Sequence, residues 1–357
     1  MARVALISDV HLGTRQYGLH IRSLDFNAAF QHAVLNAVGN GVRAIIIGGD
    51  LFDSAKPDAL SVAAAQGVIT YAKSAGVEVY GIDGNHDLAN GDWLRVIGVK
   101  PLDGCEYEIC GRRVLGVPYR NGRDLVATLQ GLADAGAKAD VLVAHFALHE
   151  MNGGGTADTG VQELTPILDK LGVRCVLMGH VHIPNCKSYN GVQFVNPGSV
   201  EMKSANEPRE KYWFDVDFDT WEAKPVKIKT RRMVDVEIVS EEALAKFQRT
   251  LQEEASGRDE KAFYNVVADA DMDQVFERLT QTVKETGAIA RIVVCARRDR
   301  DVAPMVDRRE GMATLESAIE ARFPPESREA KLVSNFLRSP SSEGIHITVK
   351  KFMEEAS

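Results

Sequence analysis

The feature that most constrains this chain is a set of five polar clusters, each of which directly follows an apolar run. One of them, Gly84-Asn85-His86-Asp87, follows residues 77–82, which predict a buried strand. The other four are Ser8-Asp9-Val10-His11, Gly48-Gly49-Asp50-Leu51-Phe52-Asp53, Ala144-His145 and Met178-Gly179-His180-Val181-His182. The carboxyl ends of strands in an open α/β sheet meet at one edge, where ligands bind. The clusters are therefore expected to converge on one small volume.

Strand and helix patterns alternate along the first part of the chain. Pro57 is predicted at the first position of a helix that continues to about residue 75. The alternation predicts a parallel sheet covered by helices. The predicted strands are 4–8, 44–47, 77–82, 113–118, 141–146 and 174–178, and the predicted helices are 23–38, 57–75 and 123–136. Residues 192–238 change to short alternating strands without helices, which indicates antiparallel strands completing a layered sandwich.

A second, smaller α/β domain is expected after residue 239. Ser240-Glu241-Glu242 is typical of a helix start, and the stretch that follows is rich in Ala, Leu and Glu. The predicted elements are strand 263–267, helix 272–286, strand 290–295, two helical patterns within 312–337 and strand 345–349. The expected domains are thus 1–239 and 240–357, and the glycine run 153–155 is predicted to be a mobile loop.

Length, composition and charge limit the class of protein to which the chain can belong. A chain of 357 residues is long enough for two domains, and no apolar run reaches the roughly 20 residues of a membrane span. The short apolar start does not resemble a signal peptide, and five cysteines without a C-x-x-C pair indicate a reducing compartment. An intracellular, soluble protein is expected. The net charge of -8 disfavours nucleic-acid binding through the chain's own surface, unless cations or a partner supply the attraction.

The clusters carry the donors of a two-metal hydrolytic site. Asp9 and His11, like His180 and His182, are expected to share one side of an extended chain. Asp50 can bridge two cations, and Asn85 and His145 add an oxygen and a nitrogen. Nitrogen and oxygen donors without thiolate suit Mn²⁺, Fe or Zn²⁺. Two such ions would bind a phosphate and stabilise the entering and leaving oxygens.

His86 is the candidate general acid. It adjoins Asn85, but its side chain can point to the opposite side, toward a leaving oxygen. A carboxylate bonded to the ring would orient it and favour the protonated form, and Asp53 is the candidate.

Each of these motifs has an ordinary structural explanation when it is taken alone. A single D-x-H triplet is most often a surface pair, and Gly-Asn-His-Asp is also a common turn. The arginine-rich stretch 297–309 is nearly cancelled by acidic neighbours, which is typical of a solvated face. Five clusters in this order, each after an apolar run, favour the metal site.

Together the clusters D-x-H, G-D-x-x-D, G-N-H-D, a lone His and G-H-x-H resemble those of the calcineurin-like metallophosphoesterases over residues 4–200. The resemblance implies that His86 pairs with Asp53. It also implies two ligand sets. The first is Asp9, His11, Asp50 and His182, and the second is Asp50, Asn85, His145 and His180.

Within that superfamily the chain is most similar to SbcD-type DNA double-strand-break repair nucleases. The residues that carry this likeness are 7–13, 49–57 and Asn196-Pro197-Gly198-Ser199-Val200-Glu201. It implies an exo- or endonuclease of DNA ends that uses Mn²⁺, forms a homodimer and works in recombination and repair with an SbcC-type coiled-coil ATPase. Residues 240–357 would form the capping domain that contacts DNA or the partner.

One departure and two alternatives stay open. Nuclease members often carry His where this chain has Asp53, which instead matches the general phosphoesterase pattern. A small-molecule phosphodiesterase or pyrophosphatase would keep every metal ligand. A scaffold that binds metal only to dock an ATPase would keep its function without His86.

Overall fold

A computed structural model of the chain describes residues 2–295, except 89–91, 105, 153–156, 205 and 258–260. The chain divides into two compact units, Met1–Val302 and Ala303–Ser357, and the described residues all belong to the first. The glycine run 153–155, the arginine-rich stretch 297–309, and the elements predicted within 312–337 and at 345–349 lie outside the described residues.

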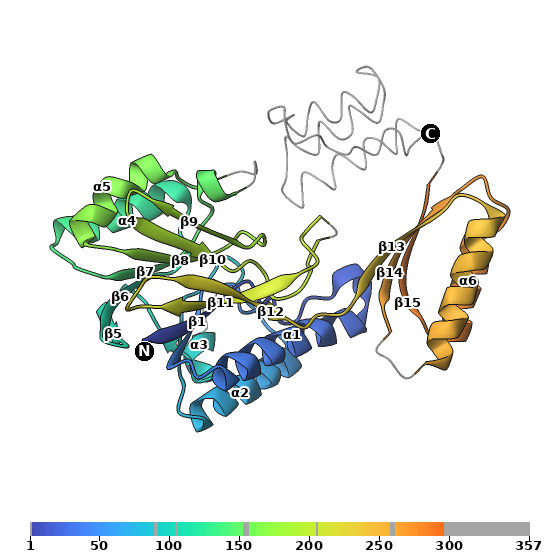
Figure 1. Ribbon diagram of the computed structural model, residues 1–357, viewed down its shortest axis with the longest axis horizontal. Coiled ribbons are helices and arrows are strands. Elements are labelled where there is room, and N and C mark those ends of the chain that lie inside the picture. The colour runs from blue at the N-terminus through green and yellow to red at the C-terminus, as the bar shows by residue number, and fades with distance from the viewer. Residues whose placement is uncertain are drawn as a thin grey trace, which may run out of the picture. The chain divides into compact units, whose positions relative to one another are not determined.

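Two six-stranded sheets form the larger part of the described structure (Figure 1). The first has the order β12-β11-β1-β2-β3-β4, and the second has the order β5-β6-β7-β8-β10-β9. The strands of the first sheet are β1 (Arg3–Ile7), β2 (Ala44–Ile47), β3 (Glu78–Gly81), β4 (Lys100–Pro101), β11 (Lys211–Asp217) and β12 (Ala223–Ile228). Those of the second are β5 (Glu106–Ile109), β6 (Arg112–Val117), β7 (Val141–His145), β8 (Cys175–Gly179), β9 (Asn185–Tyr189) and β10 (Val192–Asn196).

The continuous apolar runs of the central strands arise because both faces of each sheet are buried. In β1, Val4 and Leu6 lie in the core between the two sheets, whereas Ala5 and Ile7 face the core under the first pair of helices. Successive side chains of a strand point to opposite faces, so a strand covered on both sides needs apolar residues at every position.

Helices cover the outer face of each sheet. On the first sheet α1 (His20–Gly39) packs against α2 (Ala59–Ser74), and on the second α4 (Gly122–Asp134) packs against α5 (Val161–Leu171) (Figure 1). The predicted layered α/β sandwich is confirmed. Shorter helical turns are η1 (Gln16–Gly18), α3 (Trp93–Val96) and η2 (His149–Met151). None of the described helices combines the length and apolar character that crossing a bilayer requires.

Three details differ from the sequence prediction. Pro57 precedes the helix, because Asp58 is the N-cap of α2 and its carboxylate accepts from the backbone N–H of Ser61 at 2.9 Å. Strand β10 pairs antiparallel with β9 but parallel with β8, whereas β11 and β12 are antiparallel as predicted. Helix α5 was not predicted.

The described residues after β12 build a third sheet of three parallel strands. The elements are β13 (Met233–Ile238), α6 (Glu241–Ser256), β14 (Phe263–Asp269), α7 (Val275–Thr286) and β15 (Ile289–Cys295). Ser240 caps α6, since its hydroxyl accepts from the N–H of Ala243 at 3.2 Å. Both helices pack on this sheet in a core of their own. The elements expected within 240–295 are confirmed, while the domain boundary at 239/240 stays a prediction. Strand β13 lies in the stretch 192–238 that was expected to be antiparallel and to complete the sandwich, but it pairs parallel with β14 in this third sheet.

A buried arginine joins α1 to the loop that follows β10. Arg22 is fully buried, and its guanidinium donates to Asp25 at 2.6 Å and to Glu201 at 3.1 Å. It also donates to the carbonyl of Met202 at 3.1 Å. A buried ion pair of this kind costs desolvation when it forms, but removal of one partner leaves an unpaired buried charge.

We expect Arg22→Leu to lower the free energy of unfolding by about 3–5 kcal/mol, because Glu201 would keep a buried carboxylate without its partner. Urea denaturation measures this loss. The control is Arg249→Leu at an exposed position of α6, which should stay within about 0.5 kcal/mol of the unaltered protein. Equal stabilities of the two variants would contradict the expected role of Arg22.

Candidate metal centre

The residues predicted to form the site lie where parallel strands end, and the structure brings them together. Six of these residues lie in loops that follow strands of the first sheet, and three histidines lie at or just after the ends of strands of the second sheet. Asp9 and His11 follow β1, Asp50 and Asp53 follow β2, Asn85 and His86 follow β3, His145 ends β7, and His180 and His182 follow β8. The edge expected for ligand binding in such sheets is therefore the edge where the donors converge.

Four of these residues have a left-handed backbone. The φ angles are 52° at Asp9, 51° at His11, 50° at Asp50 and 88° at His180. The sequence had suggested extended segments for Asp9–His11 and His180–His182, which is wrong, because the chain turns sharply directly after the strands. A positive φ is unfavourable for residues with a side chain, and it is found mainly where function fixes the backbone.

A glycine and a buried aspartate hold the loops after β2 and β3 against each other. A Cβ atom on Gly84 would lie 2.2 Å from Oδ1 of Asp50, so only glycine allows this approach. Asp87 accepts hydrogen bonds from the backbone N–H groups of Leu51 at 3.0 Å, Phe52 at 2.8 Å and Gly84 at 3.1 Å. Asp87 thus fixes the loop that carries Asp50.

The first group of donor atoms comes from Asp9, His11 and His182. The Nε2 atoms of His11 and His182 face each other at 3.0 Å, and Nε2 of His182 lies 3.7 Å from Oδ1 of Asp9. Asp9 is held in place because both of its carboxylate oxygens accept from the backbone N–H of His180 at 3.0 Å.

The second group comes from Asp50, His145 and His180, with Asn85 among them. Oδ1 of Asn85 lies 2.9 Å from Nδ1 of His180 and 3.2 Å from Nε2 of His145. Oδ2 of Asp50 lies 3.4 Å from Nε2 of His145 and 3.8 Å from Nε2 of His11. Asp50 therefore stands between the two groups and can serve both.

This donor set fits a pair of divalent cations. Asp9 and Asp50 are both buried, and within the described part of the chain neither pairs with a lysine or an arginine. Burial lowers the pKa of His145, but the carboxylates of Asp50 and Asp9 outweigh it and raise that pKa to about 9. The two carboxylates thus favour positive charge at this point. The donors are carboxylate, imidazole and amide groups without thiolate, which is the set that hard or borderline divalent metals prefer.

Two of the histidines are oriented by partners on their other ring nitrogen. Nδ1 of His145 donates to the carbonyl of Gly48 at 2.8 Å, and Nδ1 of His182 donates to Glu207 at 2.8 Å. Both bonds leave Nε2 facing the donor group, as is usual for metal-binding histidines. Glu207 is not predictable from sequence motifs, because it lies 25 residues after His182 in a loop with no motif spacing.

The loop around Asn196-Pro197-Gly198-Ser199 supports the same histidine from behind. Nδ2 of Asn196 donates to the carbonyls of Val181 at 2.7 Å and Ile183 at 2.9 Å. Gly198 has φ 72°, and a Cβ there would lie 2.7 Å from the carbonyl oxygen of His182. The turn therefore fixes the backbone on both sides of His182.

Glu207 is expected to make the metal-free protein sensitive to acid. Burial raises its pKa, but His182 and the buried Lys211 outweigh this and hold the pKa at about 2, against a usual 4.5. The stabilisation is present above the usual pKa and is lost as pH falls through about 2. We expect a loss on the order of 2–3 kcal/mol between pH 5 and pH 2.

Urea denaturation in a chelator at pH 6, 4 and 3 measures this dependence. Glu207→Gln should be less stable at pH 6 and should show a shallower decline toward acid. A decline as steep as that of the unaltered protein would contradict the role of Glu207. The matched control is Glu253→Gln at an exposed position of α6, which should leave the pH dependence unchanged.

His86 lies beside the first donor group. Its backbone N–H donates to Oδ1 of Asp50 at 2.8 Å, and its ring stands edge-on to His11 with centroids 4.9 Å apart. Nδ1 donates to the backbone carbonyl of Asp53 at 2.9 Å. The carboxylate of Asp53, which the sequence predicts as the partner of His86, lies in ion-pair range of His11 and Lys203. It also belongs to a group of donor atoms with His11 and His86, all within 4.8 Å of one another, so its bond to His86 stays a prediction.

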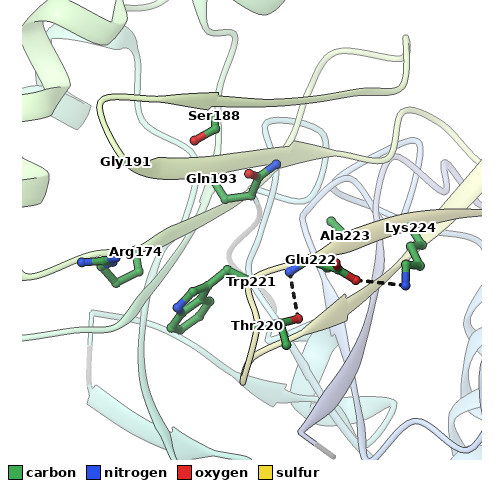
Figure 2. Close-up of a pocket in the computed structure, with 9 residues that line it drawn as sticks. All are labelled: Arg174, Ser188, Gly191, Gln193, Thr220, Trp221, Glu222, Ala223 and Lys224. Atoms are coloured by element: carbon green, nitrogen blue, oxygen red, sulfur yellow. Dashed lines mark hydrogen bonds and ion pairs between the residues drawn. The ribbon is translucent and has the colours of Figure 1, made fainter.

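A separate hollow of about 400 Å³ lies at the opposite ends of the strands. Arg174 precedes β8, and Gln193 lies near the start of β10, whereas His180 follows the far end of β8. Figure 2 shows Trp221 in this hollow beside Glu222, whose carboxylate pairs with Lys224 at 3.0 Å. None of the predicted site residues lines this hollow, so the candidate chemistry lies at the other edge.

Comparisons with known proteins agree on one family. Residues 2–219 match the family described as the calcineurin-like phosphoesterase superfamily domain. The DNA double-strand break repair protein Mre11 of Archaeoglobus fulgidus is 26% identical over 278 residues, which cover 67% of this chain and 62% of that protein. The protein of the same name from Haloferax volcanii is 26% identical over 269 residues, which cover 71% of this chain and 58% of that protein.

The chain thus spans about three fifths of the length of these relatives. Among solved structures, a dimetal phosphatase from Danio rerio is 13% identical and has a TM-score of 0.45, with coverage of 64% of this chain and 98% of that chain.

Proposed function

This chain belongs to the calcineurin-like phosphoesterase superfamily, and from that premise we propose that it is a Mn²⁺-dependent phosphodiesterase that cleaves DNA at its ends. The observation that carries the proposal is the pair of donor groups that share Asp50. The similarity to relatives described as DNA double-strand break repair proteins supports DNA as the substrate.

One ion would be held by Asp9, His11, Asp50 and His182, and the other by Asp50, Asn85, His145 and His180. When bound, such a pair neutralises phosphate charge, activates water and stabilises the entering and leaving oxygens. The protein's part is to hold seven side chains in place before substrate arrives. The strained turns, Asp87 and the partners of His145 and His182 provide this rigidity.

His86 would protonate the leaving oxygen. Because its Nδ1–H is committed to the carbonyl of Asp53, the proton that it can transfer sits on Nε2. The carbonyl acceptor orients the ring through the backbone, whatever the side chain at position 53. We propose that His86 is the general acid and that the main-chain carbonyl of Asp53 helps to orient it.

We further propose that the chain is the nuclease subunit of a recombination and repair complex inside the cell. A coiled-coil ATPase of the SbcC type and a second copy of the chain would be its partners. Residues 240–357 would be the capping domain that contacts DNA or the ATPase. The net charge of -8 is compatible with DNA binding when cations offset the carboxylates and the ATPase adds contacts.

The test is digestion of linear duplex DNA by the full chain, with Mn²⁺ and with Mg²⁺, alone and with an ATPase partner. We expect cleavage in Mn²⁺ that starts from the ends and weakens with salt. Absence of cleavage under every condition would defeat the proposal. Hydrolysis of bis-p-nitrophenyl phosphate that DNA does not inhibit would point to a small-molecule phosphodiesterase instead.

A further inference from the structure

The carboxylate of Asp53 lies closer to a candidate metal ligand than to the candidate general acid. Its Oδ1 is 3.4 Å from Nδ1 of His11 and 2.7 Å from Nζ of Lys203. His86 hydrogen-bonds this residue through the backbone carbonyl, at 2.9 Å. Ring nitrogens of His11 and His86 and a carboxylate oxygen of Asp53 also lie within 4.8 Å of one another, so the carboxylate stands near both histidines and is in ion-pair range of His11.

His11 needs a hydrogen-bond acceptor on its outer nitrogen. The ring is fully buried, and its Nε2 faces Nε2 of His182 and Oδ2 of Asp50 within the first donor group. An imidazole that offers the Nε2 lone pair to a cation carries its proton on Nδ1. A buried N–H without an acceptor is costly, and metal-binding histidines almost always donate this proton.

Of the two groups beside Nδ1, only Asp53 can accept that proton. Lys203 lies 3.0 Å from Nδ1, but an ammonium has donors and no acceptor. Oδ1 of Asp53 also pairs with Nζ of Lys203 at 2.7 Å, but a carboxylate oxygen has two lone pairs and can accept from both groups.

Lys203 holds this carboxylate in position. Besides its ion pair with Asp53, its carbonyl accepts from Gln16 at 2.8 Å and its N–H donates to Glu207 at 3.2 Å. Glu207 in turn bonds His182. The loop that carries Lys203 thus touches the supports of both histidines in the first donor group.

We propose that Asp53 is a positioning residue for His11, which accepts its Nδ1 proton while Lys203 anchors the carboxylate, so that Asp53 sets the affinity of the first cation. This inference rests on the metal dependence in the proposed function, but it concerns binding and does not require that DNA be the substrate.

The experiment is calorimetric titration of the metal-free full chain with Mn²⁺. For the unaltered protein we expect two binding steps. Asp53→Ala should weaken one step by about 10–100-fold and leave the other unchanged, because the second group does not touch Asp53. Asp53→Asn keeps an oxygen acceptor, so its affinity for Mn²⁺ in that step should fall less than that of Asp53→Ala. A general structural defect would instead weaken both steps.

A further variant provides the control. Asp169→Ala removes an exposed carboxylate on α5 and should leave both steps unchanged. Circular dichroism tests whether each variant folds. If Asp53→Ala does not fold, the affinity of Asp53→Asn alone tests the inference. Unchanged affinity in the Asp53 variants would overturn the inference and leave the proposed function intact. If the unaltered protein binds two ions but cleaves no DNA, the proposed function is wrong, while the inference on Asp53 stands.

Discussion

Replacing His86 by alanine is expected to lower the rate of phosphodiester cleavage by about 10²–10⁴-fold, the usual contribution of a general acid. Metal binding should not change, because His86 is outside both proposed ligand sets and only its backbone N–H contacts Asp50. The loss should depend on the leaving group. A p-nitrophenolate leaves without a proton, so the variant's rate of cleavage of bis-p-nitrophenyl phosphate should fall far less than its rate of DNA cleavage.

Cleavage rates of DNA and of bis-p-nitrophenyl phosphate, measured on the same preparations at saturating Mn²⁺, check this prediction. His20→Ala, at an exposed position where α1 begins, is the matched control and should keep the full rate on both substrates. An equal loss on both substrates would contradict proton transfer by His86. Full DNA repair in cells by a His86→Ala protein that no longer cleaves would favour the scaffold alternative.

Replacing Asp50 by alanine is expected to impair both metal binding and the rate of cleavage. Its carboxylate stands between the two donor groups, so both proposed cations lose a ligand at once. We expect the protein to bind fewer than two Mn²⁺ ions. If the metals stabilise the transition state by about 4 kcal/mol, losing that stabilisation lowers the rate of DNA cleavage by about 10³-fold or more.

Metal content after dialysis against Mn²⁺, together with the DNA cleavage rate, measures both effects. The matched control is Asp169→Ala, which removes a carboxylate far along the sequence on the exposed side of α5. An Asp50→Ala protein that retains two tightly bound ions would show that Asp50 does not link the two groups.

The central strands and the convergence of the clusters could be predicted because both depend on local pattern. A strand buried on both faces, such as β2 with Ile45, Ile46 and Ile47, must be apolar throughout. Once the strands are parallel and covered by helices, the residues that follow them have to meet at one edge. The helices α1, α4 and α6 could also be predicted, from the spacing of their apolar residues or from residues typical of a helix start.

Other features depend on contacts that no local pattern records. The left-handed backbone at Asp9 and Asp50 follows from how neighbouring loops pack, and aspartate gives no sign of it in advance. Glu207 and Lys203 reach the site from a loop whose sequence resembles any polar surface segment. Asp53 is the hydrogen-bond partner of His86 as predicted, but sequence spacing does not distinguish the carboxylate of Asp53 from its carbonyl, which makes the bond.

The parallel pairing of β10 with β8 shows the same limit. Val192–Asn196 alternates and follows a hairpin turn, which is typical of an antiparallel strand, and one of its two neighbours is indeed antiparallel. Its other edge pairs with β8 because the hairpin returns beside that strand. Pairing partners are fixed by the whole sheet and not by the strand itself.

The central claim is that loops from two sheets hold two divalent cations with Asp50 between them. Crystals of the protein grown with Mn²⁺ and measured at the manganese absorption edge test it directly. We expect two anomalous peaks roughly 3.5–4 Å apart, one beside His11 and His182 and the other beside His145 and His180. Peaks elsewhere, or no peaks beside Asp50, would contradict the account.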